Sequence, residues 1–85
     1  MTMEVKLTEL NWLSSSSGKF YCDPFTVTGI TKILSVTFTD FGYLNVNDNI
    51  APLLTPNVGS ALRFMSNVNT FNTGAFVKVI VHGTI

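Results

Sequence analysis

Few residues in this sequence could carry catalytic chemistry. His82 is the only histidine and Cys22 the only cysteine among the 85 residues, so a single imidazole is available as a base near neutral pH. The serine run at 14–17 lacks the Gly-x-Ser-x-Gly context of an activated nucleophile. A glycosidase needs two facing carboxylates, whereas the acidic residues here are more simply explained as turn and capping residues. We predict that the protein is not an enzyme, although a Ser/His/Asp triad or a Cys22–His82 pair could still be assembled in space.

Patterns that bind metals or cofactors are equally sparse. A tetrahedral zinc site needs four ligands, and Cys22 and His82 are the only soft ones. The segment 45–49, Asn-Val-Asn-Asp-Asn, superficially resembles a calcium loop, but it has too few carboxylates and no distal glutamate. No glycine-rich phosphate loop is present. We therefore predict no metal and no cofactor.

Aromatic and amide side chains in the polar segments favour binding over catalysis. An aromatic ring offers an apolar contact surface, and an amide offers both a donor and an acceptor. A sugar, with its C–H faces and hydroxyls, needs both. The candidate ligand-binding residues are Trp12, Tyr43, Asn45, Asn47, Asn69 and Asn72. Asparagine also favours turns in the absence of any ligand, and Trp12 is equally compatible with a place in the core.

The segments that must position these residues alternate between apolar and polar side chains, a pattern typical of β-strands. We expect strands at 3–8, 19–22, 25–27, 32–39, 50–54, 61–66 and 75–82, with polar turns or loops at 14–18, 40–49, 55–60 and 67–74. No segment shows a helical period. The sequence therefore predicts an all-β fold, a small antiparallel β-sandwich or jelly roll, in a single domain spanning residues 1–85.

Two expected strands carry apolar residues on both faces. In the last strand, one face holds Val77, Val79 and Val81, and the other holds Phe76, Lys78, Ile80 and His82. In the strand at 32–39, the expected faces are Ile33, Ser35, Thr37 and Thr39 against Leu34, Val36 and Phe38. Only one face of a strand in a two-layer sandwich points inward. The other apolar face must be shielded from water by something else, such as a neighbouring subunit.

The composition points to the same need. Hydrophobic residues make up 46% of the chain and charged residues only 12%, against about 25% charged in ordinary domains. We predict a homo-oligomer that buries either the Phe76/Ile80 face or the Val77/Val79/Val81 face between subunits and the other face in the core. The alternative is that one dense core, under an uncharged polar surface, holds all the apolar residues.

Charge and hydropathy exclude two classes of partner. The five basic residues are scattered, and five acidic residues balance them, so we expect no nucleic-acid partner. No apolar run approaches the roughly 20 residues that cross a bilayer, and we expect no membrane insertion. The first ten residues include three charged ones, which predicts that no signal peptide directs secretion.

The C-terminal two-thirds of the chain contains a recognisable order of short motifs. They are Ile-Leu-Ser-Val-Thr-Phe at 33–38, Asp-Phe-Gly at 40–42, Asp-Asn-Ile-Ala-Pro at 48–52, Leu-Arg-Phe-Met-Ser at 62–66, Thr-Phe at 70–71 and Gly-Ala-Phe-Val-Lys-Val at 74–79. This order resembles the C-terminal tip domains of tail-fibre and receptor-binding proteins of tailed bacteriophages and prophages. Their closing strand typically reads Gly-Ala-aromatic-Val-x-Val. The resemblance covers residues 30–85, and residues 1–29 supply the N-terminal strands and a serine-rich loop.

The resemblance implies a function and a location. Fibre tips are usually all-β homotrimers that bind polysaccharide or protein on the host surface, so it implies a virion tail-tip protein made in the host cytoplasm. The family has no universal binding residues that could be transferred to this chain. One departure is size, because fibre proteins carry an N-terminal shaft and this sequence starts at Met1. A purely structural virion module without a specific ligand is the alternative function.

Overall fold

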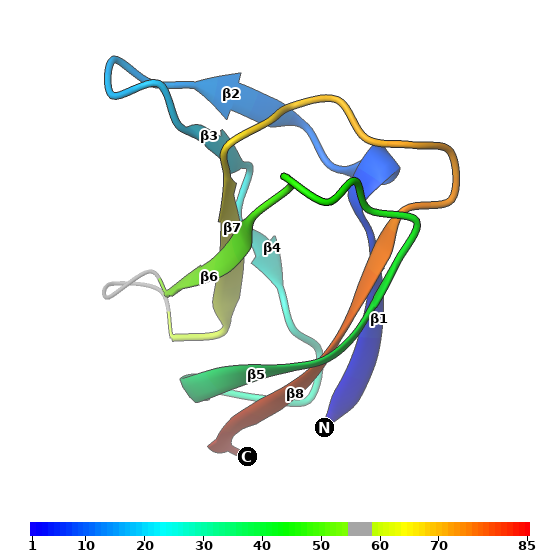
Figure 1. Cartoon of the computed structure of the whole chain (residues 1–85). Coiled ribbons are helices and arrows are strands. Elements are labelled where there is room, and N and C mark those ends of the chain that lie inside the picture. Colours follow the sequence, from blue (N-terminus) through cyan, green and yellow to red (C-terminus); the bar gives the residue numbers. More distant parts are fainter. Residues whose placement is uncertain (55–58) are drawn as a thin grey trace.

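The chain forms two antiparallel sheets that pack against each other as a small β-sandwich (Figure 1). The computed structural model describes residues 1–54 and 59–85, so most of the predicted turn at 55–60 lies outside the described residues. The first sheet has the order β1 (Thr2–Lys6), β8 (Phe76–Thr84), β5 (Lys32–Gly42). The second sheet contains β2 (Trp12–Ser14), β3 (Phe20–Cys22), β4 (Phe25–Thr26), β6 (Ile50–Leu54) and β7 (Ala61–Ser66). The predicted all-β sandwich is confirmed.

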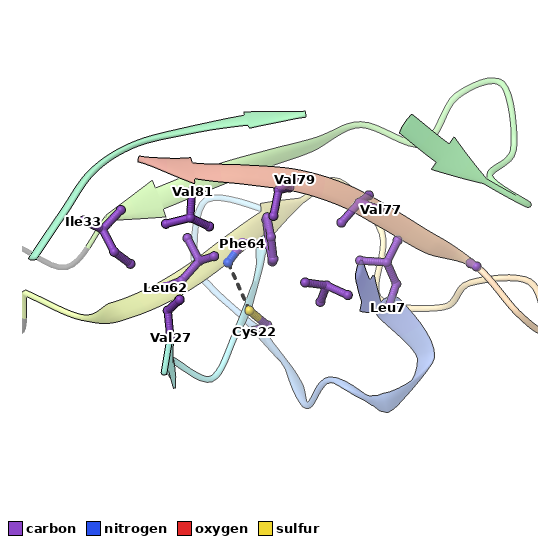
Figure 2. Packing of buried hydrophobic residues seen from close by; sticks show 11 residues of the cluster. Leu7, Cys22, Val27, Ile33, Leu62, Phe64, Val77, Val79 and Val81 are labelled. Atoms are coloured by element: carbon purple, nitrogen blue, oxygen red, sulfur yellow. Dashed lines mark hydrogen bonds between the residues drawn. The ribbon is translucent and has the colours of Figure 1, made fainter. Parts of the chain in front are cut away.

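The core lies between the central strands of the two sheets, as Figure 2 shows. Val77, Val79 and Val81 of β8 are at most 1% exposed, and they face Leu62 and Phe64 of β7, which are fully buried. Strict alternation places the other residues of β8 on the outer face of the first sheet. The predicted division of this strand into two faces is therefore confirmed. Of the two proposed interface faces, the valine face lies in the core, which leaves the Phe76/Ile80 face.

The predicted faces of the strand at 32–39 were wrong for Ile33. Ile33 is buried, whereas Ser35, Thr37 and Thr39 are exposed. The register explains the difference: Ile33 pairs with Gly83 and Ser35 with His82, so Leu34 is an extra residue in β5. Such a β-bulge shifts the alternation by one residue, and a second one follows between Phe38 and Asp40. The core side of β5 therefore carries Ile33, Val36 and Phe38.

The N-terminal segment also departs from the prediction. The first strand ends at Lys6, and Leu7–Glu9 forms a single 3₁₀ turn, η1. Leu7 is buried, as is Val5, and its N–H donates to the Ala75 carbonyl at 3.0 Å, so the pairing with the β8 segment extends one residue beyond the strand before the chain turns. The short strand β2 was not predicted; it pairs with β3 across the serine-rich loop. Among the described residues, no helix is long enough to cross a bilayer.

Two loops meet at the end of the sandwich that lies away from both termini (Figure 1). They are residues 43–49, which link β5 to β6, and residues 67–74, which lead to β8; together we call them the loop end. Hydrogen bonds join them, from Asn67 Nδ2 to the Asn47 carbonyl at 2.7 Å and from Asn72 Nδ2 to the Tyr43 carbonyl at 3.0 Å. Five of the six predicted ligand-binding residues lie in the loop end, all except Trp12, and they are described next.

Candidate ligand-binding site at the loop end

Tyr43 is the most exposed aromatic residue in the described part of the chain. Its side chain is 70% exposed. Its φ of 58° lies in the left-handed region, and it is the only non-glycine residue of the described chain with a positive φ. Left-handed backbone costs an L-residue about 1–2 kcal/mol. Strained residues of this kind persist only when their surroundings hold them, and they cluster at functional sites.

Two asparagine side chains hold this backbone in place. Asn72 Nδ2 donates to the Tyr43 carbonyl and to Asn45 Oδ1, both at 3.0 Å. A carbonyl can only accept, so the orientation of the Asn72 amide is fixed, and Asn45 must turn its oxygen towards Asn72. Among the described contacts, this leaves Asn72 Oδ1 and the Asn45 NH₂ group available to a ligand. Both residues are exposed.

The turn that carries Asn45 is closed by Asp48. The Asn45 N–H donates to Asp48 Oδ2 at 3.1 Å, and the Asp48 N–H donates to the Asn45 carbonyl at 3.0 Å. The backbone bond closes a four-residue turn, and the Asp48 carboxylate reaches back to the first N–H of that turn, as the carboxylate of a capping box does. The segment that superficially resembled a calcium loop is thus an ordinary turn. Within the described residues, no three acidic, histidine or cysteine side chains form a group able to hold a metal ion.

The Tyr43 ring packs against Phe76 at the end of β8. The ring centroids lie 6.4 Å apart, and the rings meet edge to face at 67°. Phe76 lies across the backbone of Gly42, where a Cβ would overlap its ring. Gly74 has a φ of 82°, which favours glycine, but a Cβ there would meet the Tyr43 ring only at an ordinary contact distance of 3.7 Å. Gly42 is therefore the glycine that makes room for this aromatic pair, Tyr43 and Phe76.

Charged residues lie beside the aromatic pair on the outer face of the first sheet. The strand register aligns Lys6, Phe76 and Gly42 in one row. The next row aligns Glu4, Lys78 and Asp40, with the lysine between the two acids. Lys78 Nζ also lies 5.8 Å from the centre of the Phe76 ring. The two bases and two acids of these rows balance in charge.

The predicted binding residues fall into separate groups. Tyr43, Asn45 and Asn72 come together, as described above. Asn47 lies in the same loop, but only its carbonyl is engaged, by Asn67. Asn69 is exposed in the other loop, where its Oδ1 accepts from the Thr70 hydroxyl at 3.3 Å. Asn47 and Asn69 therefore lie in the loop end, but neither has a described contact with Tyr43.

Trp12 has a structural environment. It is half-buried, its Nε1 donates to the Leu7 carbonyl at 3.0 Å, and its ring centre lies 5.2 Å from that of Phe71. A buried tryptophan normally satisfies its N–H in this way. The contacts favour the alternative role considered for Trp12, a place in the core beside the first strand.

The sequence analysis missed two residues of this site. Neither was a candidate for ligand binding: Phe76 was considered as an interface residue, and Gly42 appeared only in the Asp-Phe-Gly motif. Their proximity to Tyr43 depends on the pairing of β5 with β8, which joins Gly42 to Phe76. The sequence signal was the glycine directly before an aromatic residue at the end of a strand, because Gly in a strand often marks a close approach of another group.

The two residues considered for nucleophilic chemistry do not form a pair. Cys22 is fully buried in β3, whereas His82 is exposed on β8 of the other sheet. Burial raises the pKa of the Cys22 thiol, and this outweighs the lowering effect of the Phe64 N–H, which donates to its sulfur at 3.0 Å. Figure 2 shows this bond inside the core. The sulfur is therefore a protonated core atom.

Two pockets are also found among the described residues; the first borders the loop end at Asn49 and Asn67, and the second lies apart from it. One of about 90 Å³ lies at the ends of β6 and β7, beside Lys19 and Asn49. The other, of about 290 Å³, lies along β1 beside Glu4 and Phe25. Binding pockets for small molecules typically measure about 300–1,000 Å³. The first pocket is too small for a whole ligand, and the second only approaches the lower limit.

Comparison with known proteins gives no relative. No family model, no curated protein and no solved structure matches this chain.

Proposed function

We propose that this protein is a receptor-binding tip module of a tailed-bacteriophage fibre that recognises glycan on the host cell surface through the loop end. The observation that carries the proposal is the 70% exposed ring of Tyr43, held on a left-handed backbone. A solvent-exposed turn could place glycine there at no steric cost. A largely exposed aromatic ring at a backbone position that favours glycine is consistent with a binding role for the ring.

The surroundings of Tyr43 support recognition over catalysis. Tyr43, Asn45 and Asn72 are all exposed, the polar side chains in contact around Tyr43 are amides, and neither His82 nor Cys22 lies in the loop end. Exposed tyrosine and asparagine recur where proteins bind by surface contact, because tyrosine gives a large rigid contact area and asparagine adaptable hydrogen bonds. In the proposed virion, the module acts as a homo-oligomer, most simply a trimer, at the tail tip.

A structural module without a specific ligand is the second candidate. This candidate is favoured because the asparagine side chains and backbones already make hydrogen bonds within the fold. Asn72 and Asn67 join the two loops, and Asn45 closes a turn with Asp48. These residues would be needed even if nothing bound.

Binding to host cells and to a panel of immobilised bacterial surface glycans tests the proposal. We expect the fluorescently labelled protein to bind, and Tyr43→Ala to lose the binding. Phe41→Ala is the matched control, because Phe41 is a 48% exposed aromatic two residues away whose register partner is the core residue Val77.

The remaining outcomes of this binding experiment each point to a different explanation. If the native protein binds neither cells nor glycans, the structural module replaces the receptor-binding module. Equal loss in both variants would assign the effect to folding and remove Tyr43 from the site. Release of sugar products from host polysaccharide would establish an enzyme.

A further inference from the structure

We infer that the loop end binds an uncharged sugar ring, with the aromatic pair against an apolar face of the sugar and Asn45 and Asn72 on neighbouring hydroxyls. This inference rests on the proposed function and specifies the ligand class of the same site. It follows from three features of the described residues: the placement of the rings, the polarity of the two amides and the balance of charge.

The aromatic pair offers two surfaces that meet at an angle. The Tyr43 side chain is 70% exposed, and the Phe76 ring lies half-buried across the backbone of Gly42. Their planes meet at 67°. A pyranose has a face of C–H groups that can rest on such a ring, with its edge against the second ring. Aromatic side chains supply most of the apolar contact in sites of this kind.

The two exposed amides leave one donor group and one acceptor without a partner among the described contacts. The Tyr43 carbonyl fixes the Asn72 amide, so Asn72 presents Oδ1, and Asn45 presents its NH₂. A hydroxyl both donates and accepts one hydrogen bond. Two neighbouring hydroxyls of a sugar satisfy this combination, one accepting from Asn45 and the other donating to Asn72. A carboxylate or phosphate can only accept, so Asn72 Oδ1 would repel it.

The charges around the site do not favour an anion. Lys78 lies between Glu4 and Asp40, and Lys6 is the only other base of the two rows. Asp48 adds a third acid within the loop end. Three acids against two bases give a formal charge of −1, so an acidic sugar would meet no net attraction. An uncharged ligand avoids this cost.

The ligand class can be measured on the native protein with a glycan array that contains neutral, acidic and amino sugars. Calorimetry on the bound glycans at 50 mM and 500 mM NaCl follows. We expect neutral hexose-containing glycans to bind, with a Kd that changes less than twofold between the two salt concentrations. Interactions between exposed charges weaken with salt, and contacts to uncharged groups do not.

Two variants separate the ligand role of the site from its structural role. Asn45→Asp keeps an oxygen that accepts the Asn72 amide but removes the NH₂ group, so we expect at least a fivefold loss of affinity without loss of thermal stability. Phe76→Leu keeps the apolar volume and removes the ring, and we expect about a tenfold loss. Phe41→Ala serves again as the control and should bind as the native protein does.

The outcomes distinguish this inference from the proposed function. Binding of acidic or amino sugars that weakens in 500 mM NaCl would overturn the neutral ligand and leave receptor binding in place. Neutral glycans that bind Asn45→Asp and Phe76→Leu as tightly as the native protein would overturn the site. Absence of binding to every glycan and to host cells would overturn the proposed function itself.

Discussion

At the scale of single residues, Tyr43 combines a strained backbone, which lowers the stability of the fold, with an aromatic contact, which raises it. Its φ of 58° favours glycine, while its ring packs on Phe76. An edge-to-face aromatic pair contributes about 0.5–1.5 kcal/mol, and the left-handed backbone costs about 1–2 kcal/mol. The two terms are of similar size, so the identity of this residue has little net effect on stability. This leaves the residue open to selection for binding.

Substitution of Tyr43 by glycine and by alanine measures the strain directly. Both variants lose the aromatic contact, but only Tyr43→Gly also relieves the backbone. We therefore expect Tyr43→Gly to be more stable than Tyr43→Ala by about 1 kcal/mol, and both to lose glycan binding. Urea denaturation gives the two free energies of unfolding. Equal stabilities would show that position 43 is not held in the left-handed region in solution.

The buried thiol of Cys22 predicts a pH dependence of stability. Burial raises its pKa in the folded state, from about 8.5 for a free cysteine. Between the unfolded and the folded pKa, the folded protein holds more protons than the unfolded chain, so the free energy of unfolding falls as pH rises. We expect this loss above about pH 8.5 in the native protein and not in Cys22→Ser. Denaturation curves from pH 7.5 to 9.5 that shift in parallel for both proteins would contradict the prediction.

The same residue also accepts a buried backbone hydrogen bond. Phe64 N–H donates to Cys22 Sγ at 3.0 Å. Alanine at position 22 would leave this N–H without its partner, at a cost of about 1–3 kcal/mol. Serine retains an acceptor in nearly the same place, which makes Cys22→Ser the better variant for the pH measurement.

At the scale of strands, prediction from the sequence succeeded for the central strands and for the edge strand β6, and it failed where β5 is bulged and where β1 ends. The bounds of β7 were predicted to the residue, and both faces of β8 were correct. Each of these strands pairs on both sides, so its alternation continues without interruption. β5 pairs with one strand of the sheet only and contains two bulges. A bulge shifts the alternation by one residue, but its position depends on the partner strand, so the sequence of β5 alone does not show which residue is the extra one.

The candidate site was predicted by residue type but not by arrangement. Tyr43, Asn45 and Asn72 were selected as an aromatic ring and two amides with binding potential. Their contact joins positions separated by 27 to 29 residues. That contact requires β5 and β8 to pair in one register, which brings their ends together. Local sequence carries no information about such a meeting.

The bulge at Leu34 gives a prediction at this scale. Deletion of Leu34 would pair Ile33 and Ser35 with Gly83 and His82 in continuous register and keep Ile33 facing the core. Deletion of Thr37 would instead turn the preceding residues to the opposite face, because strand side chains alternate with a period of two. We expect the Leu34 deletion to fold with a loss of about 1 kcal/mol or less, and the Thr37 deletion to be unfolded. Circular dichroism and thermal melting of both proteins distinguish the cases, and two unfolded proteins would contradict the assigned bulge.

At the scale of the whole molecule, the two outer faces of the sandwich differ in character. The first sheet carries the charged rows beside Phe76. Across the second sheet, the register aligns Leu13, Tyr21, Met65 and Ala51 from four neighbouring strands. Among the described strand residues of this second face, Arg63 is the only charged one, and its guanidinium lies over Tyr21 at 5.6 Å from the ring centre. Tyrosine, methionine and arginine are enriched in the centres of protein interfaces, while lysine and acidic residues are depleted.

This difference bears on the expected homo-oligomer. The apolar composition predicted that one face would be shared between subunits, and Phe76 and Ile80 were the candidates. If Phe76 contacts a sugar, the second sheet offers the alternative surface for a second copy of the chain. Its exposed leucines, Leu13 and Leu53, are 47% and 38% exposed, and pairing would remove both from water.

Light scattering coupled to size-exclusion chromatography tests the assembly and its face together. We expect a mass of about 28 kDa, three times the 9.3 kDa of one chain. A charge placed in the centre of an apolar contact is buried without a partner and breaks it. Leu13→Glu should therefore yield monomers, while Ile80→Glu, on the charged sheet, should leave the trimer intact. The reverse result would assign the interface to the Phe76/Ile80 face and place the sugar site at the subunit boundary.

A native mass of one chain would mean that a single core holds the apolar excess, and the loop end would then act as a single binding site rather than one of three.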